Sequence, residues 1–168
     1  RLSTIRHYRL STKRWALTGC AGRKANVIKS FYLAEGALEK FNLKLQKKYK
    51  DIQAKEQRWE EFFLSDAKVV LVAYGSMSRI TKAAVKILRG KGKKVGLIRP
   101  ITLWPFPKKA FAGPKNKYLA VEMSYGQMLE DVQLAVNGKA GVEFLGRSGG
   151  GIPSEKEIIA KVNKIYNG

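Results

Sequence analysis

The sequence predicts an α/β domain of three layers, in which helices cover both faces of a mostly parallel sheet. Four short apolar runs alternate with helical patterns in the second half of the chain, and this alternation is typical of parallel sheets with crossover helices. The 168 residues, 45% of them hydrophobic, suffice for one compact core, because domains usually have roughly 100 to 150 residues. We therefore expect one α/β domain over residues 66–168 and an extension over 1–65.

The extension begins with a basic, irregular segment that ends near residue 33 and has no apolar core of its own. From about residue 34 to 63, large apolar residues recur mostly three or four positions apart among Lys and Glu, which predicts an amphipathic helix. We expect its apolar stripe to pack against the domain or a partner subunit. The stripe consists of Leu38, Phe41, Leu45, Tyr49, Ile52, Trp59 and Phe63.

The domain is predicted to begin with a buried strand at residues 68–74, which are rich in Val and Leu. Residues 75–78 interrupt this run, and apolar side chains then recur on one helical face up to residue 88. Gly90 and Gly92 end the helical pattern. These features predict one strand, a turn and one helix.

The rest of the domain continues the alternation. A second strand at residues 94–98 leads into a loop in which Pro100, Pro105 and Pro107 disfavour helix. Acidic residues follow Pro153, as is typical of the first turn of a helix. The sequence predicts a strand, a helix, a strand and a final helix at residues 118–122, 127–136, 142–145 and 153–166.

Two turns at predicted strand ends are weak candidates for anion binding, because Gly-rich loops and helix N-termini expose backbone N–H groups. Each also has an ordinary structural explanation, which we favour. In the first turn, at residues 75–78, Ser76 or Ser78 can serve as a helix N-cap. The second turn, at residues 147–150, lacks the Gly-Lys-Ser/Thr ending of a P-loop, so we expect it to be a tight strand-to-helix connection. The candidate residues are Gly75, Ser76, Ser78, Arg147, Gly149 and Gly150.

The predicted strand ends also carry aromatic, Met and polar residues of the kind enriched in protein interfaces. Glu122 closes an apolar strand, either as a buried general base or as a paired carboxylate, and we expect an ion pair with Arg99. No nucleophile, base and orienting group can be assembled, so no catalytic residue is assigned. The interface candidates are Arg99, Trp104, Phe106, Glu122, Tyr125, Gln127 and Met128; most of them could equally belong to the core.

The chain has a formal net charge of +20, which would suit a nucleic acid or another anionic partner. The sequence shows no helix-turn-helix, no aromatic stacking platform and no clustered Arg stripe, which disfavours nucleic-acid binding. The alternative is that Lys is simply the preferred surface residue.

Cys20 and His7 are the only residues of their types, so we expect no Cys/His metal site and no Cys-ligated iron–sulfur cluster on this chain. No window approaches the roughly 20 consecutive apolar residues of a membrane helix, and the basic start lacks the apolar run of a signal peptide. We therefore expect a cytoplasmic protein without a membrane partner. Because no Met precedes Arg1, we also expect a fragment of a longer protein.

Residues 66–166 resemble the C-terminal domain of the alpha subunit of 2-oxoacid:ferredoxin oxidoreductases, and the 2-oxoisovalerate type is the most similar. The order and combination of the motifs carry this resemblance. They are Asp66-Ala-Lys-Val-Val-Leu-Val-Ala-Tyr-Gly75, Val95-Gly-Leu-Ile-Arg-Pro-Ile-Thr-Leu-Trp-Pro-Phe-Pro107, Val121-Glu-Met-Ser-Tyr-Gly-Gln-Met128, Glu130-Asp-Val132 and Gly146-Arg-Ser-Gly-Gly-Gly-Ile-Pro153. The linker that precedes this domain in the family is similar to Trp15-Ala-Leu-Thr-Gly19, Leu43-Lys-Leu-Gln46, Lys48-Tyr49 and Arg58-Trp-Glu-Glu61.

The resemblance implies a fold like the transketolase C-terminal domain and a part in assembly and site shaping rather than in direct catalysis. It implies coenzyme A-dependent oxidative decarboxylation of a 2-oxoacid by the whole complex. Thiamine diphosphate, coenzyme A and iron–sulfur clusters are expected there, and none of these cofactors on this chain. The expected partners are the beta, gamma and delta types of subunit, and ferredoxin through the complex.

The charge departs from the family pattern, because the helix predicted after residue 78 and the segment that follows it are more basic than the resemblance implies. The basic residues there are Arg79, Lys82, Lys86, Arg89 and Lys93. The alternative function is accordingly a free-standing basic α/β module that binds nucleic acid or another polyanion.

Overall fold

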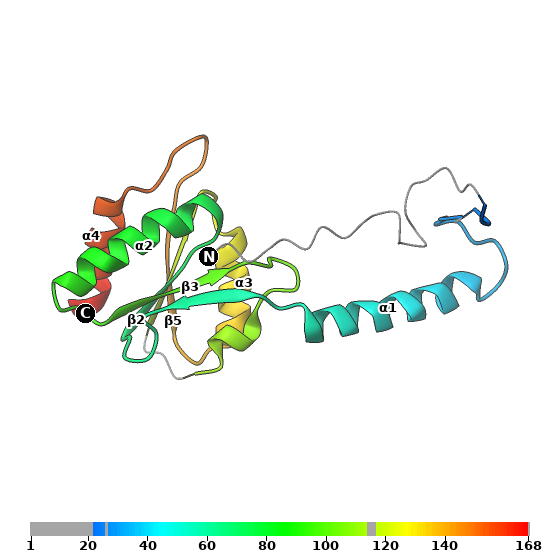
Figure 1. Ribbon diagram of the computed structural model, residues 1–168, viewed down its shortest axis with the longest axis horizontal. Coiled ribbons are helices and arrows are strands. Elements are labelled where there is room, and N and C mark those ends of the chain that lie inside the picture. Colours follow the sequence, from blue (N-terminus) through cyan, green and yellow to red (C-terminus); the bar gives the residue numbers. More distant parts are fainter. Residues whose placement is uncertain (1–21, 26, 114–116, 168) are drawn as a thin grey trace. The chain divides into compact units, whose positions relative to one another are not determined.

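The computed structural model describes residues 22–25, 27–113 and 117–167. It divides into two compact units, Arg1–Leu45 and Gln46–Gly168 (Figure 1). The described part of the first unit contains no strand, and its only helix is the beginning of α1 (Ala37–Lys55), which has no buried residue. The Tyr32 and Phe41 rings lie 5.0 Å apart, centroid to centroid, within this unit.

The helix expected over residues 34–63 is shorter than predicted. Helix α1 ends at Lys55, and Trp59–Phe62 form strand β1. The chain becomes extended here because its backbone pairs with another strand: the Arg58 N–H donates to Thr102 Oγ1 at 3.0 Å, and the Ile101 N–H donates to the Arg58 carbonyl at 2.9 Å. Trp59 therefore lies in a strand, and Phe63 follows that strand with a φ of 53°, so neither belongs to the helical stripe.

The described residues of the second unit form one five-stranded sheet in the order β1-β3-β2-β4-β5. Strands β2, β3, β4 and β5 run parallel, and only β1 is antiparallel, paired with β3 at the edge. The strands other than β1 span Val69–Val72 (β2), Val95–Pro100 (β3), Lys117–Glu122 (β4) and Gly141–Gly146 (β5).

Helices cover both faces of this sheet. Helices α2 (Gly75–Gly90) and α4 (Glu155–Asn167) lie together on one face, and α3 (Gln127–Val136) lies on the other (Figure 1). The short 3-10 helix η2 (Lys108–Phe111) joins the α3 side. Side chains of the strands alternate between these layers, so Leu71 and Leu97 pack under α2 and α4, while Val72 and Ile98 pack under α3.

Local interactions explain where individual elements begin and how closely they pack. Helix α4 begins with a capping box, in which Ser154 and Glu157 hydrogen-bond reciprocally; the Ser154 N–H donates to Glu157 Oε2 at 2.8 Å. At Gly96, an added Cβ would stand 2.7 Å from the Phe63 carbonyl oxygen. The chain that leaves β1 therefore passes so close to β3 that only glycine fits there.

The predicted three-layer α/β fold is confirmed. The strands and helices expected after residue 66 occur in the expected order, with bounds that differ by at most two residues, except that α2 begins at Gly75, four residues before its expected start. The division of the chain differs from the expected boundary at residue 65, because β1 pairs with the sheet and the compact unit begins at Gln46.

Candidate functional site

The parallel register brings the carboxyl ends of β2, β3, β4 and β5 to one edge of the sheet, and the predicted site residues lie at these ends or in the segments that follow them. Val72 lies beside Ile98 on one side and Ala120 on the other, and Glu122 lies beside Gly146. In open α/β sheets, the crevice outside the carboxyl ends of the strands is where ligands bind. This carboxyl edge is therefore the candidate site.

The expected ion pair between Arg99 and Glu122 is absent. Arg99 Nη1 instead lies 2.9 Å from Glu60 Oε2 on β1. Strand β2 separates β3 from β4, and the alternation of side chains places Arg99 on the α2 side of the sheet and Glu122 on the α3 side. Two strands that are consecutive in this part of the sequence are thus not neighbours in the sheet.

Glu122 organises the beginning of α3. Its side chain is completely buried, and its Oε2 accepts a hydrogen bond from the Met128 N–H at 2.8 Å. Within the described residues, Oε1 has no hydrogen-bond partner. Gly126 precedes the helix with a φ of 109°, a backbone conformation that favours glycine. A carboxylate beside exposed helix N–H groups is electrostatically favourable, so Glu122 has a structural role at this position.

The aromatic and Met candidates divide into exposed and buried residues. Tyr125 is 74% exposed, Trp104 is 56% exposed, and Gln127 is also exposed. In contrast to the surface role expected from the sequence, Phe106 is only 7% exposed and Met128 is buried; both belong to the core under α3. The loop that follows Trp104 turns inward and places Phe106 against the Phe111 ring, with centroids 5.8 Å apart.

The first anion-site candidate, at the N-terminus of α2, has a different cap from the one expected. Tyr74 is the N-cap residue, and no side chain caps the helix there. Ser78 is buried and its Oγ donates to the Gly75 carbonyl at 2.7 Å, while Gly75 and Ser76 are exposed. Ser78 is thus already engaged, and a role of this turn in anion binding stays a prediction.

The second candidate, the turn between β5 and α4, connects a strand to a helix. Gly149 and Gly150 have φ values of 63° and 84°, which allow the chain to reverse. Arg147 is exposed and its Nη1 lies 3.4 Å from Glu157 Oε1. This arrangement agrees with the structural use that we favoured, and the basic side chain already has a carboxylate partner.

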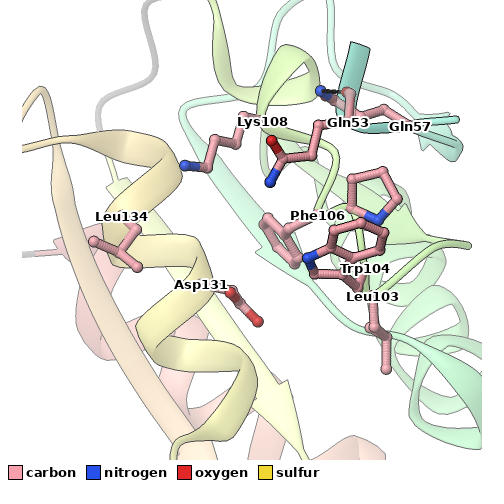
Figure 2. Close-up of a pocket in the computed structure, with 9 residues that line it drawn as sticks. Gln53, Gln57, Leu103, Trp104, Phe106, Lys108, Asp131 and Leu134 are labelled. Atoms are coloured by element: carbon pink, nitrogen blue, oxygen red, sulfur yellow. Dashed lines mark hydrogen bonds between the residues drawn. The ribbon is translucent and has the colours of Figure 1, made fainter. Parts of the chain in front are cut away.

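A cavity of about 300 Å³ opens beside the carboxyl edge, between the end of α1, the loop after β3 and helix α3 (Figure 2). Sequence reasoning identified Trp104 and Phe106 in its wall but missed its polar residues, which are Gln53, Gln57, Lys108 and Asp131. Burial, together with the negative charges of Glu130 and Glu122, raises the pKa of the Asp131 carboxyl, and Lys108 opposes this effect. The sequence pattern contained no signal for the cavity, since its walls come from three distant segments.

Several candidate polar side chains of the carboxyl edge already have partners within the domain. Arg147, Ser78 and Glu122 are engaged by Glu157, Gly75 and Met128. Among the described residues, no group of three or more His, Cys, Asp or Glu side chains could hold a metal ion, and Cys20 and His7 lie outside them. We therefore assign no chemical step to this part of the chain.

Comparison with known families identifies the domain. Residues 67–158 match the family described as pyruvate:ferredoxin oxidoreductase core domain II. The chain belongs to this family. The resemblance noted from the sequence motifs is thereby confirmed, and the match covers β2 to the beginning of α4, including the whole carboxyl edge.

Relatives of this core domain II are subunits of 2-oxoacid oxidoreductases. The chain is 42% identical over 154 residues to the ketoisovalerate oxidoreductase subunit VorB of Methanothermobacter marburgensis and 40% identical to that of Methanothermobacter thermautotrophicus. Each alignment covers 90% of the chain and 44% of the relative. The 2-oxoglutarate synthase subunit KorA of M. marburgensis is 40% identical over 58% of the chain and 27% of its own length.

Solved structures support the fold. The 2-oxoglutarate:ferredoxin oxidoreductase from Magnetococcus marinus matches with a TM-score of 0.65 and 20% identity, over 79% of this chain and 24% of that one. A split-gene transketolase, an inactive β4 tetramer, matches with a TM-score of 0.52 and 18% identity, over 62% and 40% of the two chains. The core domain II thus shares its fold with a transketolase, as expected. In the described part of the chain, no helix has the length and apolar character needed to cross a membrane.

Proposed function

We propose that this chain is the C-terminal part of the alpha subunit of a thiamine diphosphate-dependent 2-oxoacid:ferredoxin oxidoreductase that acts on a branched-chain 2-oxoacid. The observation that carries the proposal is the 40 to 42% identity to two VorB subunits over 90% of the chain. The chain spans less than half the length of these relatives, so the reaction requires the rest of the subunit and its partners. Beta, gamma and delta types of subunit, ferredoxin and a cytoplasmic location belong to this proposal.

In this proposal the chain assembles and shapes the enzyme and does not itself carry the reaction. The described polar groups at the carboxyl edge are largely engaged within the domain, as for Glu122 and Arg147. The loop between β4 and α3 instead presents apolar surface: Tyr125 is 74% exposed, and Met123 and Gln127 beside it are exposed too. Exposed Tyr and Met are enriched in interfaces, so this loop is the surface proposed to contact a neighbouring domain or subunit.

Reconstitution tests this proposal. The full-length subunit that contains this segment would be expressed with its partner subunits, and reduction of ferredoxin measured with coenzyme A and 2-oxoisovalerate, 2-oxoglutarate or pyruvate. We expect the highest kcat/KM with 2-oxoisovalerate and no activity from the 168-residue chain alone. A preference for 2-oxoglutarate or pyruvate would refute the branched-chain assignment.

The role of the loop between β4 and α3 is tested in the same full-length subunit with Tyr125→Ala. Failure of this variant to weaken assembly with the partner subunits would refute the role of the loop.

The charge supports a second candidate, a module that binds a polyanion. Residues 67–121 contain 13 Lys and Arg and no Asp or Glu, and basic stretches of this kind are typical of nucleic-acid-binding surfaces. Titration of a labelled DNA duplex at several salt concentrations distinguishes the candidates. Tight binding at physiological salt, with a steep salt dependence, would favour the module; weak binding together with activity in the reconstituted complex would exclude it.

A further inference from the structure

The cavity beside the carboxyl edge is built from three segments of the second unit. The last turn of α1 contributes Gln53, the loop after β3 contributes Trp104, and α3 contributes Asp131. The loop after β3 is held to the end of α1. Lys109 Nζ donates to the Ala54 carbonyl at 3.2 Å, and the Lys109 N–H donates to Gln57 Oε1 at the same distance. Hydrogen bonds therefore hold two of the three wall segments together.

Much of the wall is apolar and open to solvent. Trp104 is 56% exposed, Leu134 is 67% exposed, and Leu103 is nearly half exposed. The Trp104 ring is oriented by Tyr49, which it meets edge to face with centroids 5.7 Å apart. An open apolar wall next to a cavity of about 300 Å³ can bury the hydrocarbon part of a small molecule.

Two opposite charges complete the cavity. Figure 2 shows the Asp131 carboxylate extending from α3 towards Trp104 and Phe106, while Lys108 extends across from the opposite side towards α3. Within the described residues, neither side chain makes a hydrogen bond or an ion pair. The pKa of Asp131 is raised mainly by burial, and the Lys108 charge acts in the opposite direction. The Asp131 carboxyl and the Lys108 amine are therefore available to a ligand as one acceptor and one donor.

We propose that this cavity binds a free 2-amino acid with an apolar side chain. The ammonium group would lie at Asp131, the carboxylate at Lys108, and the hydrocarbon side chain against Trp104 and Leu103. A zwitterion satisfies both charges of the cavity, whereas a simple amine or a simple carboxylate would satisfy one and face repulsion from the other. This inference rests on the geometry of the cavity and does not depend on the proposed function.

The ligand series is tested first with the unmodified full chain, by calorimetry and by tryptophan fluorescence. Leucine is the probe, and three analogues are its controls: 3-methylbutan-1-amine lacks the carboxylate, 4-methylpentanoate lacks the ammonium, and glycine lacks the side chain. We expect saturable binding of leucine and at least roughly tenfold weaker binding of each analogue, since each loses a charge-assisted contact or the apolar contact. Equal binding of an analogue, or no leucine binding up to about 10 mM, would overturn the proposal.

Substitutions then locate the site. Asp131→Asn and Lys108→Gln should each weaken leucine binding roughly tenfold or more. Glu155→Gln at the beginning of α4 and Lys139→Gln, both outside the cavity, are the matched controls and should leave it unchanged. Circular dichroism of each variant verifies folding. Binding that is unaffected by both cavity substitutions, or weakened equally by the controls, would place the ligand elsewhere and refute the assignment.

Discussion

At the scale of single residues, burial distinguishes core aromatic residues from exposed ones, which the sequence pattern could not do. Phe106 is 7% exposed and contacts the Phe111 ring, whereas Tyr125 is 74% exposed. We expect Phe106→Ala to lower the free energy of unfolding by about 3 to 5 kcal/mol and Tyr125→Ala to change it by less than about 0.5 kcal/mol. Urea denaturation of the two variants measures this difference. Equal losses would show that Tyr125 also packs in the core.

Tyr118 makes the free energy of unfolding of the domain depend on pH in the alkaline range. It is 2% exposed, and burial raises its pKa to about 12 from an ordinary value of 10.0. Between these values the unfolded chain releases the phenolic proton and the folded chain retains it. The free energy of unfolding should therefore be unaffected by this group below pH 10 and fall as pH rises from 10 to about 12.

The comparison with Tyr118→Phe isolates this contribution from other alkaline titrations. The variant should lose the part of the pH slope that belongs to Tyr118, and absorbance titration of tyrosinate should lose its component near pH 12. If both proteins show the same slope between pH 10 and 12, the Tyr118 hydroxyl is accessible in the folded state and this prediction is wrong.

At the scale of elements, the capping box determines where α4 begins. Ser154 Oγ donates to Glu157 Oε2 at 2.7 Å and accepts from the Glu157 N–H at 3.3 Å. These bonds from Ser154 lower the pKa of the exposed Glu157 carboxyl, so their stabilising effect is lost as pH falls through that lowered pKa. We expect Ser154→Ala to destabilise the domain by about 1 kcal/mol near neutral pH.

Thermal or chemical unfolding at neutral and acidic pH checks the cap prediction. The difference between the unmodified chain and Ser154→Ala should shrink at acidic pH, where Glu157 is protonated. Ser148→Ala, in the exposed turn before the helix, is the control and should have little effect. A destabilisation that does not depend on pH would show that the Ser154 hydroxyl acts without the Glu157 carboxylate.

At the scale of the whole molecule, the position of β1 decides which fragment folds. Strand β1 covers the edge of β3 by antiparallel pairing, and its Glu60 pairs with Arg99. Removal of residues 1–45 should leave a folded monomer, because the second compact unit begins at Gln46. Removal of residues 1–65 should expose the β3 edge, which lowers stability and promotes association.

Size-exclusion chromatography and thermal unfolding of the two truncated chains test this boundary. The chain that begins at residue 46 should have a melting temperature close to that of the full chain. If the chain that begins at residue 66 is equally stable and monomeric, β1 is dispensable and the boundary expected from the sequence is the better description of the domain.

The sequence by itself determined the order of strands and helices from residue 68 onward, the mostly parallel sheet and the family. Local patterns suffice for the elements and the sheet, because buried parallel strands are continuous apolar runs and amphipathic helices repeat every three or four residues. The family followed from the resemblance of the motifs. The turns chosen as candidate sites were also located correctly at the strand ends, since Gly and Pro interrupt each run.

Only the tertiary structure decided how distant segments meet. Trp59 and Phe63 fit a helical stripe in the sequence, but Trp59 lies in β1, which pairs with β3, and Phe63 follows that strand with a φ of 53°. Arg99 pairs with Glu60 and not Glu122, because β2 lies between two strands that follow each other closely in the sequence. The cavity around Trp104 and Asp131 likewise depends on contacts between residues far apart in the chain, which local periodicity does not encode.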